Sequence, residues 1–280
     1  MREIEARVIT QKTKEAFIAA NMALPESLEM CIKNSAKTED FPLAKSVLEK
    51  LGENLELAKK INVPICQDTG MAVVFARVGQ EVHICGGLFA EAINQGVREA
   101  YTEGDLRFSV VGDPLKRENT NDNTPAIIHA EIVGGDQMEL VCVPKGFGSE
   151  NASRIKMFEP SAGEDDIVDF IAETVKIAGG NPCPPLVVGV GIGGDFEYSA
   201  ILAKHALTRE IGVGNPDAYC GGLEKKALEK INETGIGPQG FGGKTTAFAV
   251  NIETYPTHIA GLPVAVNICC HVCRHKRIVI

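Results

Sequence analysis

The sequence predicts an α/β fold, in which a helical N-terminal segment over residues 1–62 precedes a mixed α/β region that continues to residue 280. Two observations support this prediction. Apolar residues recur every three to four positions before residue 62, and short β-type runs alternate with helical stretches after it. No internal repeat, low-complexity tract or linker interrupts the chain, so we expect one compact domain over residues 1–280.

The first sixty residues show the period of amphipathic helices. Pro25 interrupts the pattern and restarts it, and residues 46–61 continue it. The apolar positions of the first helix are Ile4, Val8, Ile9, Ala16, Ala19 and Met22.

From residue 63 onward, β-type runs are separated by glycine-rich loops and by helical stretches. The expected strands cover residues 71–78, 126–132, 138–143, 186–190 and 246–252. The expected helices cover residues 88–100, 165–178 and 198–207.

The run Gly189-Val-Gly-Ile-Gly-Gly194 fits the glycine pattern of dinucleotide-binding folds, between an expected strand and an expected helix. That pattern requires a second strand ending in an acidic residue after the helix. Residues 209–217 are turn-rich instead. A helix start framed by glycines could receive a carboxylate, but a tight strand-to-helix turn is the preferred interpretation.

The charge balance narrows the classes of partner. The formal net charge of −9 disfavours nucleic acid and anionic membranes, although a local basic pocket could hold a dianionic substrate. The N-terminus lacks the apolar stretch of a signal peptide, and no apolar run is long enough to span a bilayer. A cytoplasmic location is therefore expected.

Nine cysteines are present, and an odd number in a chain of this length does not indicate a disulfide framework. Most are expected to be small hydrophobic residues of the interior. This group comprises Cys31, Cys85, Cys142 and Cys220, which have apolar or glycine neighbours.

Three cysteines instead lie in breaks of the chain: Cys66 in 64–70, Cys183 in 180–185 and one cysteine near residue 270. Such loops present a thiolate rather than bury it. Three separated thiolates can hold three irons of a cubane cluster and leave the fourth iron open as a Lewis acid. Gln67 and Asp68 follow Cys66 directly, which places an amide and a carboxylate beside the proposed metal and suits acid–base chemistry.

The third ligand is not fixed by spacing, because Cys269, Cys270 and Cys273 all compete for it. A zinc site formed by Cys270, His271, Cys273 and His275 is a further alternative. No second Cys/His pair is spaced to complete such a site, so the zinc interpretation is disfavoured.

Several sequence blocks together resemble the α subunit of the class I, iron–sulfur fumarate hydratases and of the related L-tartrate dehydratases. They recur in the family order over residues 60–280. The blocks are Cys-Gln-Asp-Thr-Gly (66–70), Leu-Arg-x-Ser-Val-Val (106–111), Asn-Thr-x-Asp-Asn (119–123), Pro-Lys-Gly-x-Gly-Ser-Glu-Asn (144–151), Pro-Cys-Pro-Pro (182–185), the glycine run 189–194 and Tyr-Pro-Thr-His-Ile-Ala-Gly-Leu-Pro-Val-Ala (255–265).

This resemblance implies a [4Fe-4S] cluster held by Cys66, Cys183 and, by its distance from the last block, Cys270. It also implies roles toward the substrate: catalytic roles for Asp68 and His258, and substrate binding by Gln67, Arg107 and the backbone of Gly148. Two positions depart from the family pattern. Phe147 interrupts a run of glycines, and Asp195 introduces an acidic residue to which no role is assigned.

The implied reaction is the reversible hydration of fumarate to (S)-malate, with Asp68 passing a proton to or from the hydroxyl. Dehydration of L-tartrate to oxaloacetate and hydration of mesaconate are the alternatives. No C–H base is evident in this chain, so the resemblance implies a separate β subunit that supplies it, in an α2β2 assembly that acts on a dicarboxylate. An iron–sulfur electron-transfer or sensor protein and a zinc-stabilised structural subunit are alternatives of other classes.

Overall fold

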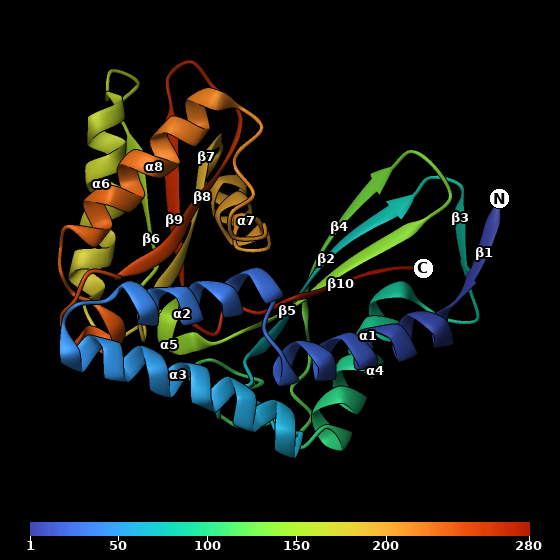
Figure 1. The fold of residues 1–280 in the computed structure, drawn as a ribbon. Coiled ribbons are helices and arrows are strands. Elements are labelled where there is room, and N and C mark those ends of the chain that lie inside the picture. The colour runs from blue at the N-terminus through green and yellow to red at the C-terminus, as the bar shows by residue number, and fades with distance from the viewer. The chain divides into compact units, whose positions relative to one another are not determined.

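The computed structural model describes all residues from Met1 to Ile280 (Figure 1). Its internal contacts divide the chain into two compact units, each assembled from segments that are distant in sequence. Unit 1 consists of Met1–Leu24, Glu56–Phe147 and Arg274–Ile280, and unit 2 consists of Pro25–Leu55 and Gly148–Cys273. A single domain over residues 1–280 stays a prediction.

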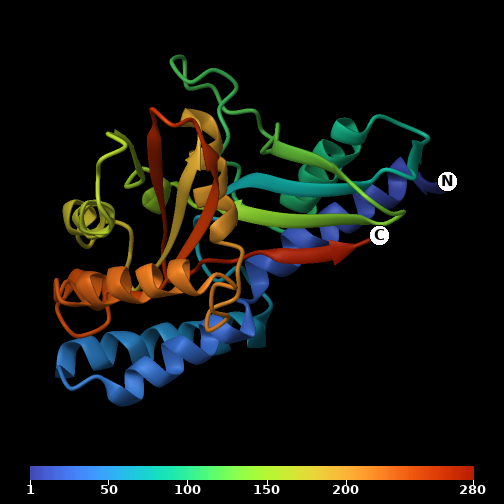
Figure 2. The ribbon, with the colours of Figure 1, turned by 90° about the horizontal axis from the view of Figure 1, so that it is seen from above.

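Unit 1 is built on a four-stranded sheet in the order β10-β5-β2-β4. Strand β2 pairs parallel with β4 and antiparallel with β5, and β5 pairs antiparallel with β10. Figure 2 shows the four strands side by side. Their bounds are Met71–Gly79 (β2), Ile127–Val133 (β4), Met138–Lys145 (β5) and Lys276–Val279 (β10).

Helices α1 (Ala6–Met22) and α4 (Phe89–Glu103) pack against each other, and α1 also packs against β5 and β10. A separate two-stranded parallel sheet joins β1 (Arg2–Glu5) to β3 (Val82–Cys85). The helices bury one apolar stripe each, as amphipathic surface helices do. The core includes Ile9, Phe17, Val74, Ile93, Tyr101 and Leu140.

Unit 2 contains a second four-stranded sheet in the order β6-β9-β7-β8. Strands β7 and β8 are parallel, and β9 is antiparallel to both β6 and β7. The strands span Arg154–Phe158 (β6), Leu186–Gly194 (β7), Ala247–Thr257 (β8) and Leu262–Cys269 (β9).

Two faces of this sheet are covered differently, because side chains alternate along a strand. Val188 and Val190 of β7 belong to a core that includes residues of α6 (Glu164–Ala178) and α8 (Ala218–Asn232). Helix α7 (Phe196–Ala206) packs over the alternate positions, Gly189 and Gly191. The remaining elements are α2 (Glu26–Thr38), α3 (Pro42–Ile61), the short α5 (Phe147–Glu150) and a 3-10 turn at Pro238–Gly240.

The glycine run of residues 189–194 therefore serves helix–strand packing. A Cβ atom on Gly189 would lie 2.0 Å from the carbonyl oxygen of Ala203, and one on Gly191 would lie 2.0 Å from that of Ser199. Asp195 is the N-cap of α7, and its Oδ1 accepts a hydrogen bond of 2.9 Å from the backbone N–H of Tyr198. This contact gives Asp195 a structural role.

The predicted fold class is confirmed: helices occupy most of residues 6–61, and mixed sheets with further helices follow. The structure adds elements that the sequence pattern did not reveal. These are the four-residue strand β1, strands β3, β6, β9 and β10, helices α5 and α8, and the 3-10 turn at Pro238–Gly240. No helix has the length and apolar character that crossing a bilayer requires.

Candidate functional site

The Cys66 loop joins α3 to β2 within unit 1. Cys66 and Asp68 are half-buried there, and Gln67 is exposed. The backbone N–H of Ile65 donates to the carbonyl of Asn21 at 3.0 Å, which ties the start of the loop to the end of α1. Gly70 closes the loop with φ +80°, and a Cβ atom there would lie 2.8 Å from the backbone of Lys145. Only glycine fits this turn.

The carboxylate of Asp68 is oriented by two backbone amides. Its Oδ1 accepts from the N–H of Gly70 at 3.1 Å, and its Oδ2 accepts from the N–H of Phe147 at 3.0 Å. The buried guanidinium of Arg274 donates through Nη2 to the carbonyl oxygen of the same aspartate. A Cβ atom on Gly146 would lie 2.9 Å from Asp68 Oδ2, so this neighbour has to be small. The carboxylate thus has a defined direction before any ligand binds.

Two buried side chains that the sequence did not reveal form hydrogen bonds with backbone carbonyls of this loop. The hydroxyl of Tyr101 lies 2.7 Å from the carbonyl oxygen of Thr69 and 2.9 Å from that of Gly70. The Nδ2 of Asn123 donates to the Gly70 carbonyl at 3.2 Å, while its Oδ1 accepts from the N–H of Ser109 at 2.7 Å. Burial raises the pKa of the Tyr101 phenol, so the hydroxyl stays a donor. In the sequence, Asn123 belongs to the Asn-Thr-x-Asp-Asn block, whereas Tyr101 belongs to none of the family blocks.

Arg107 lies beside the Cys66 loop because its main chain is hydrogen-bonded to Thr69. Its N–H donates to Thr69 Oγ1 at 2.9 Å, and that hydroxyl lies 3.3 Å from the Arg107 carbonyl oxygen. The side chain of Arg107 is exposed. Unit 1 therefore places Gln67, Asp68 and Arg107 on two hydrogen-bonded loops.

Unit 2 brings Cys183 and Cys270 to the same end of its sheet. Cys183 precedes β7, Cys270 follows β9, and the antiparallel register pairs Val187 with Cys269. The backbone N–H of His271 donates to the Cys183 carbonyl at 3.3 Å. Cys183 is exposed and Cys270 half-buried. The loops of these two cysteines are therefore hydrogen-bonded to each other.

Burial separates Cys270 from its competitors. Cys269 is the last residue of β9 and is 6% exposed, as is Cys273, whose Sγ lies 3.7 Å from the carbonyl oxygen of Leu207. Cys270 lies just beyond the strand, where a thiolate is accessible. This arrangement favours Cys270 as the third ligand.

Cys183 has an unusual backbone conformation. Its φ of +56° lies in the left-handed region, which costs a residue with a Cβ atom about 1–2 kcal/mol. Strained conformations of this kind are concentrated at functional sites. Pro184 and Pro185 follow it directly and limit the freedom of the loop.

His258 does not lie with these cysteines. It occupies the turn between β8 and β9, where its Nδ1 accepts from the N–H of Ala260 at 3.2 Å. Eight residues of β9 separate this turn from Cys270, which corresponds to roughly 25 Å at the rise of a strand. Within unit 2, His258 and Cys270 are at opposite ends of the sheet.

Gly148 is exposed in α5, and no atom lies within 4 Å of a Cβ atom built on it. Its backbone is therefore accessible to a ligand, and Phe147 beside it is 47% exposed, so its ring does not fill the core. The departure from the family's glycine run leaves this backbone uncovered.

No group of three or more His, Cys, Asp and Glu residues is assembled that could hold a metal ion. The zinc interpretation of residues 270–275 thus gains no support. The three cysteines of the cluster hypothesis are divided between the units, with Cys66 in unit 1 and Cys183 and Cys270 in unit 2. Their chemistry fits iron nevertheless, because all three are thiols on loops and none is buried.

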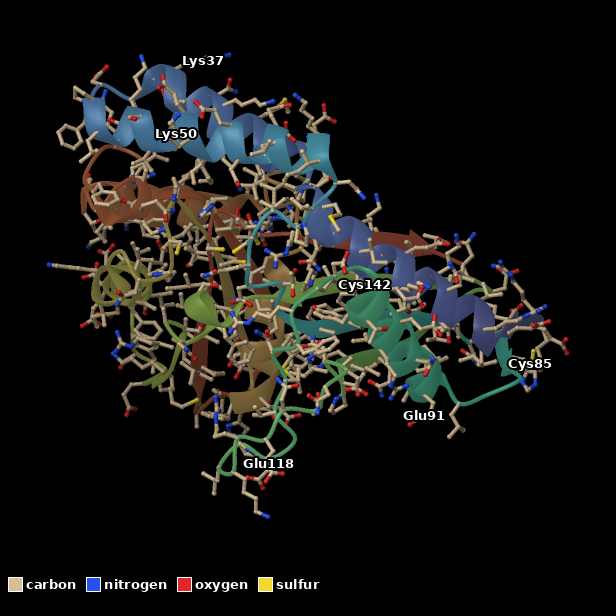
Figure 3. All side chains as sticks on the ribbon, turned by 90° about the horizontal axis from the view of Figure 1, so that it is seen from below. Lys37, Lys50, Cys85, Glu91, Glu118 and Cys142 are labelled. Carbon is tan, nitrogen blue, oxygen red and sulfur yellow. The ribbon has the colours of Figure 1, made fainter.

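Two of the four cysteines that were expected in the interior are buried. Cys142 lies on β5 inside unit 1, and burial raises the pKa of its thiol to about 12 (Figure 3). Cys220 is also buried, and burial raises its pKa. Cys31 and Cys85 are only half-buried, so they are less interior than the sequence suggested.

Comparison with known proteins agrees with the motifs. The family model described as fumarate hydratase matches residues 10–279. A candidate L(+)-tartrate dehydratase subunit alpha of Methanocaldococcus jannaschii is 41% identical over 268 residues, with 94% of each chain covered. The L(+)-tartrate dehydratase subunit alpha of Escherichia coli strain K12 is 31% identical over 258 residues, covering 91% of this chain and 84% of its own length.

The match over almost the whole chain, the matching relatives and the ordered Cys66–Gly70 and Cys183 loops agree with one another. The chain therefore belongs to the fumarate hydratase family of hydro-lyases, together with the α subunits of tartrate dehydratases.

Proposed function

We propose that this chain is the catalytic α subunit of a [4Fe-4S]-dependent hydro-lyase that reversibly hydrates fumarate to (S)-malate. The observation that carries the proposal is the orientation of the Asp68 carboxylate by two backbone amides. Asp68 lies two positions after Cys66, in a loop whose sequence matches the family. Dehydration of L-tartrate to oxaloacetate is the second candidate, because the relatives named above are tartrate dehydratase subunits. With fumarate as substrate, the reaction would belong to the tricarboxylic acid cycle.

Cys66, Cys183 and Cys270 would hold the cluster as three thiolate ligands. When bound, such a cluster supplies an open iron that acts as a Lewis acid toward the hydroxyl group of the substrate. A sensor or electron-transfer protein would not need Asp68 and Arg107 held on adjoining loops as well.

The chain's own residues would bind the dicarboxylate and move one proton. Asp68 accepts or returns the hydroxyl proton, with its two amide donors keeping the carboxylate aimed. Arg107 offers an exposed guanidinium on an anchored main chain, which suits a substrate carboxylate. Gln67 would donate from its exposed amide, and the uncovered backbone of Gly148 would contact another substrate oxygen.

His258 would also act on the substrate. Its place at the far end of β9 from Cys270 supports a site to which a second copy of the α chain contributes the β8–β9 turn. We therefore assign His258 to the site of a neighbouring α chain.

The C–H base would come from a β subunit in an α2β2 assembly in the cytoplasm. The relatives are named as subunit alpha, which supports a partner chain. The test is anaerobic co-expression with a β subunit of this family, followed by assays with malate, L-tartrate and mesaconate. We expect turnover of malate that requires both subunits. Failure with all three substrates would overturn the lyase proposal, and full activity of the cluster-loaded α chain alone would overturn the divided site.

A spectroscopic experiment separates this proposal from the electron-transfer or sensor class. Addition of malate to the loaded protein is expected to change the environment of one iron. A cluster that does not respond to any dicarboxylate would favour the other class.

A further inference from the structure

His271 follows Cys270 directly and contacts the loop of Cys183, the other proposed ligand in unit 2. Its backbone N–H lies 3.3 Å from the carbonyl oxygen of Cys183, and its ring Nδ1 lies 2.9 Å from the same oxygen. His271, which follows the proposed ligand Cys270, thus contacts the main chain of the proposed ligand Cys183. A zinc role, which the sequence had left open for His271, is not needed to explain this side chain.

Gln239 secures the next carbonyl of the same loop. Its backbone N–H and its side-chain Nε2 each donate to the carbonyl oxygen of Pro184 at 2.8 Å. Nε2 also lies 3.2 Å from Nδ1 of His271. Two consecutive carbonyls, those of Cys183 and Pro184, therefore receive three donor contacts from two residues distant in sequence, and a fourth when Nδ1 of His271 carries the ring proton.

The role of the His271 ring depends on its neutral tautomer. With the proton on Nδ1, the ring donates to the Cys183 carbonyl. With the proton on Nε2, Nδ1 accepts from Gln239, and the backbone N–H of His271 still donates to Cys183. Only the first tautomer gives a ring hydrogen bond to Cys183, and in the second the loops are linked by the backbone N–H of His271 and through Gln239.

These contacts complete the constraints on the cysteine loop. The rings of Pro184 and Pro185 fix their own φ angles, and the donors to the two carbonyls fix the direction of the peptide planes between them. Cys183 is thereby held in its left-handed conformation at φ +56°. Gly180 and Gly240 allow the two loops to approach, because a Cβ atom on Gly240 would lie 2.8 Å from Cα of Gly180.

We propose that His271 and Gln239 are positioning residues that hold the Cys183 loop beside the end of β9, so that Cys183 and Cys270 are presented together before iron binds. This inference rests on the proposed cluster. It adds that the two proposed ligands of unit 2, Cys183 and Cys270, form a preorganised pair whose spacing depends on the clamp formed by His271 and Gln239. Groups that orient metal ligands in this way typically change metal retention by about 10- to 100-fold.

The test compares iron retention among variants reconstituted anaerobically with iron and sulfide. Gln239→Gly removes the side-chain donors but keeps the backbone N–H, and glycine accepts the φ of +53° at this position without strain. His271→Ala removes the ring, and His271→Asn restores a donor at about the position of Nδ1. Each protein is measured for iron and sulfide content, for the rate of iron loss to a chelator, and for the melting temperature of the cluster-free form.

We expect Gln239→Gly and His271→Ala to lose iron roughly tenfold faster than the wild type. The melting temperature of the cluster-free Gln239→Gly protein should not fall, because glycine relieves the left-handed conformation at this position, and His271→Asn should recover most of the retention. Unchanged iron loss in Gln239→Gly and His271→Ala would overturn the inference. A fall in retention of Gln239→Gly that is matched by a lower melting temperature would overturn it as well, in favour of a purely structural role.

Failure of the underlying function gives a different result. If the wild type takes up no iron and sulfide, or if Cys183→Ser retains them as well as the wild type does, the cluster proposal itself is overturned, and this inference with it. Faster loss in the clamp variants of a protein that loads normally supports both.

Discussion

The hydroxyl of Tyr101 lies 2.7 Å from the carbonyl oxygen of Thr69, one residue after Asp68. The ring is 1% exposed and belongs to the core of unit 1, so the position of the loop that carries Cys66 and Asp68 is tied to the packing of α4. A hydrogen bond from the interior to the backbone of a loop is a direct way to transmit the rigidity of a core to a site.

Tyr101→Phe removes only this hydroxyl and leaves the ring in place. We expect the free energy of unfolding of the protein to fall by about 1–3 kcal/mol, because buried carbonyl groups lose a donor. Turnover should fall as well, since the loop that carries Asp68 loses one of its supports. Denaturant unfolding and steady-state kinetics with malate measure the two effects.

Tyr255→Phe is the matched control, because Tyr255 is 53% exposed and its substitution removes an equivalent hydroxyl. Its stability should change by less than about 0.5 kcal/mol. Equal effects of the two substitutions would contradict the role assigned to Tyr101.

Cys183 offers a test of strain against function. Cys183→Gly relieves the left-handed conformation at φ +56°, whereas Cys183→Ala keeps it. The cluster-free Cys183→Gly protein should be more stable than Cys183→Ala by about 1 kcal/mol. Both should fail to retain iron, and urea unfolding with iron analysis provides the measurement. A Cys183→Gly protein that is less stable than Cys183→Ala would show that the left-handed conformation carries no cost here.

Asp68→Asn probes the oriented carboxylate. The substitution preserves size but removes the charge, and one of the two backbone amides, of Gly70 or Phe147, then faces an NH2 group instead of an acceptor. We expect turnover to fall by about 10²- to 10⁴-fold, the range of a lost acid–base group.

Iron content distinguishes the catalytic role of Asp68 from a structural one. It should stay at the wild-type level in Asp68→Asn, because the cysteines are untouched. Loss of iron together with activity would mean that Asp68 acts by supporting the Cys66 loop rather than by proton transfer.

The buried thiol of Cys142 predicts a pH effect. Burial raises its pKa from 9.0 to about 12, so the folded state holds this proton more tightly than the unfolded state does. The contribution of this group to the free energy of unfolding is fully present below about pH 9 and is lost as the pH rises toward 12. Its loss approaches about 1.4 kcal/mol per pH unit within that window.

Cys142→Ala should therefore show a shallower decline in stability above pH 9 than the wild type. Alkylation of the cluster-free native protein at pH 8 should modify the exposed Cys183 and spare Cys142. Modification of Cys142 at the rate of Cys183 would show that β5 opens readily, against its place in the core.

Sequence patterns identified the helices of the N-terminal segment and the strands with uniform β-type runs, such as β2 and β5. They missed β9, which begins Leu262-Pro263, since a proline argues against a central strand. Pro263 lies opposite Met157 at the end of β9 where pairing with edge strand β6 begins, and there it is tolerated. Helix α8 was missed because Gly221 and Gly222 interrupt its helical pattern.

The same limit applies to the site. Neighbouring residues along the chain revealed Cys66, Gln67 and Asp68 as a group. Spacing could not choose Cys270 over Cys269, because the choice depends on where β9 ends and which thiol it buries. Nor could it reveal the contacts of Tyr101 and His271, whose partners are separated from them by 32 and 88 positions. Tertiary contacts of this kind leave no local pattern.

The separation of His258 from Cys270 along β9 leads to a test with two inactive chains. If His258 serves the site of a neighbouring α chain, then His258→Ala and Cys270→Ser damage different sites when the two variants assemble together. Each mixed pair then contains one site in which both residues are intact. Co-expression of the two variants with the β subunit should restore roughly a quarter of the wild-type activity by random pairing.

The control is each variant expressed alone, which should be inactive, together with a mixture of Cys183→Ser and Cys270→Ser. Those two cysteines belong to the same unit of one chain, so no pairing can rescue them. If His258→Ala and Cys270→Ser also fail to complement each other, His258 acts within its own chain or not at all. Recovery only in the mixture that contains His258→Ala would establish that the β8–β9 turn works across an interface between α chains.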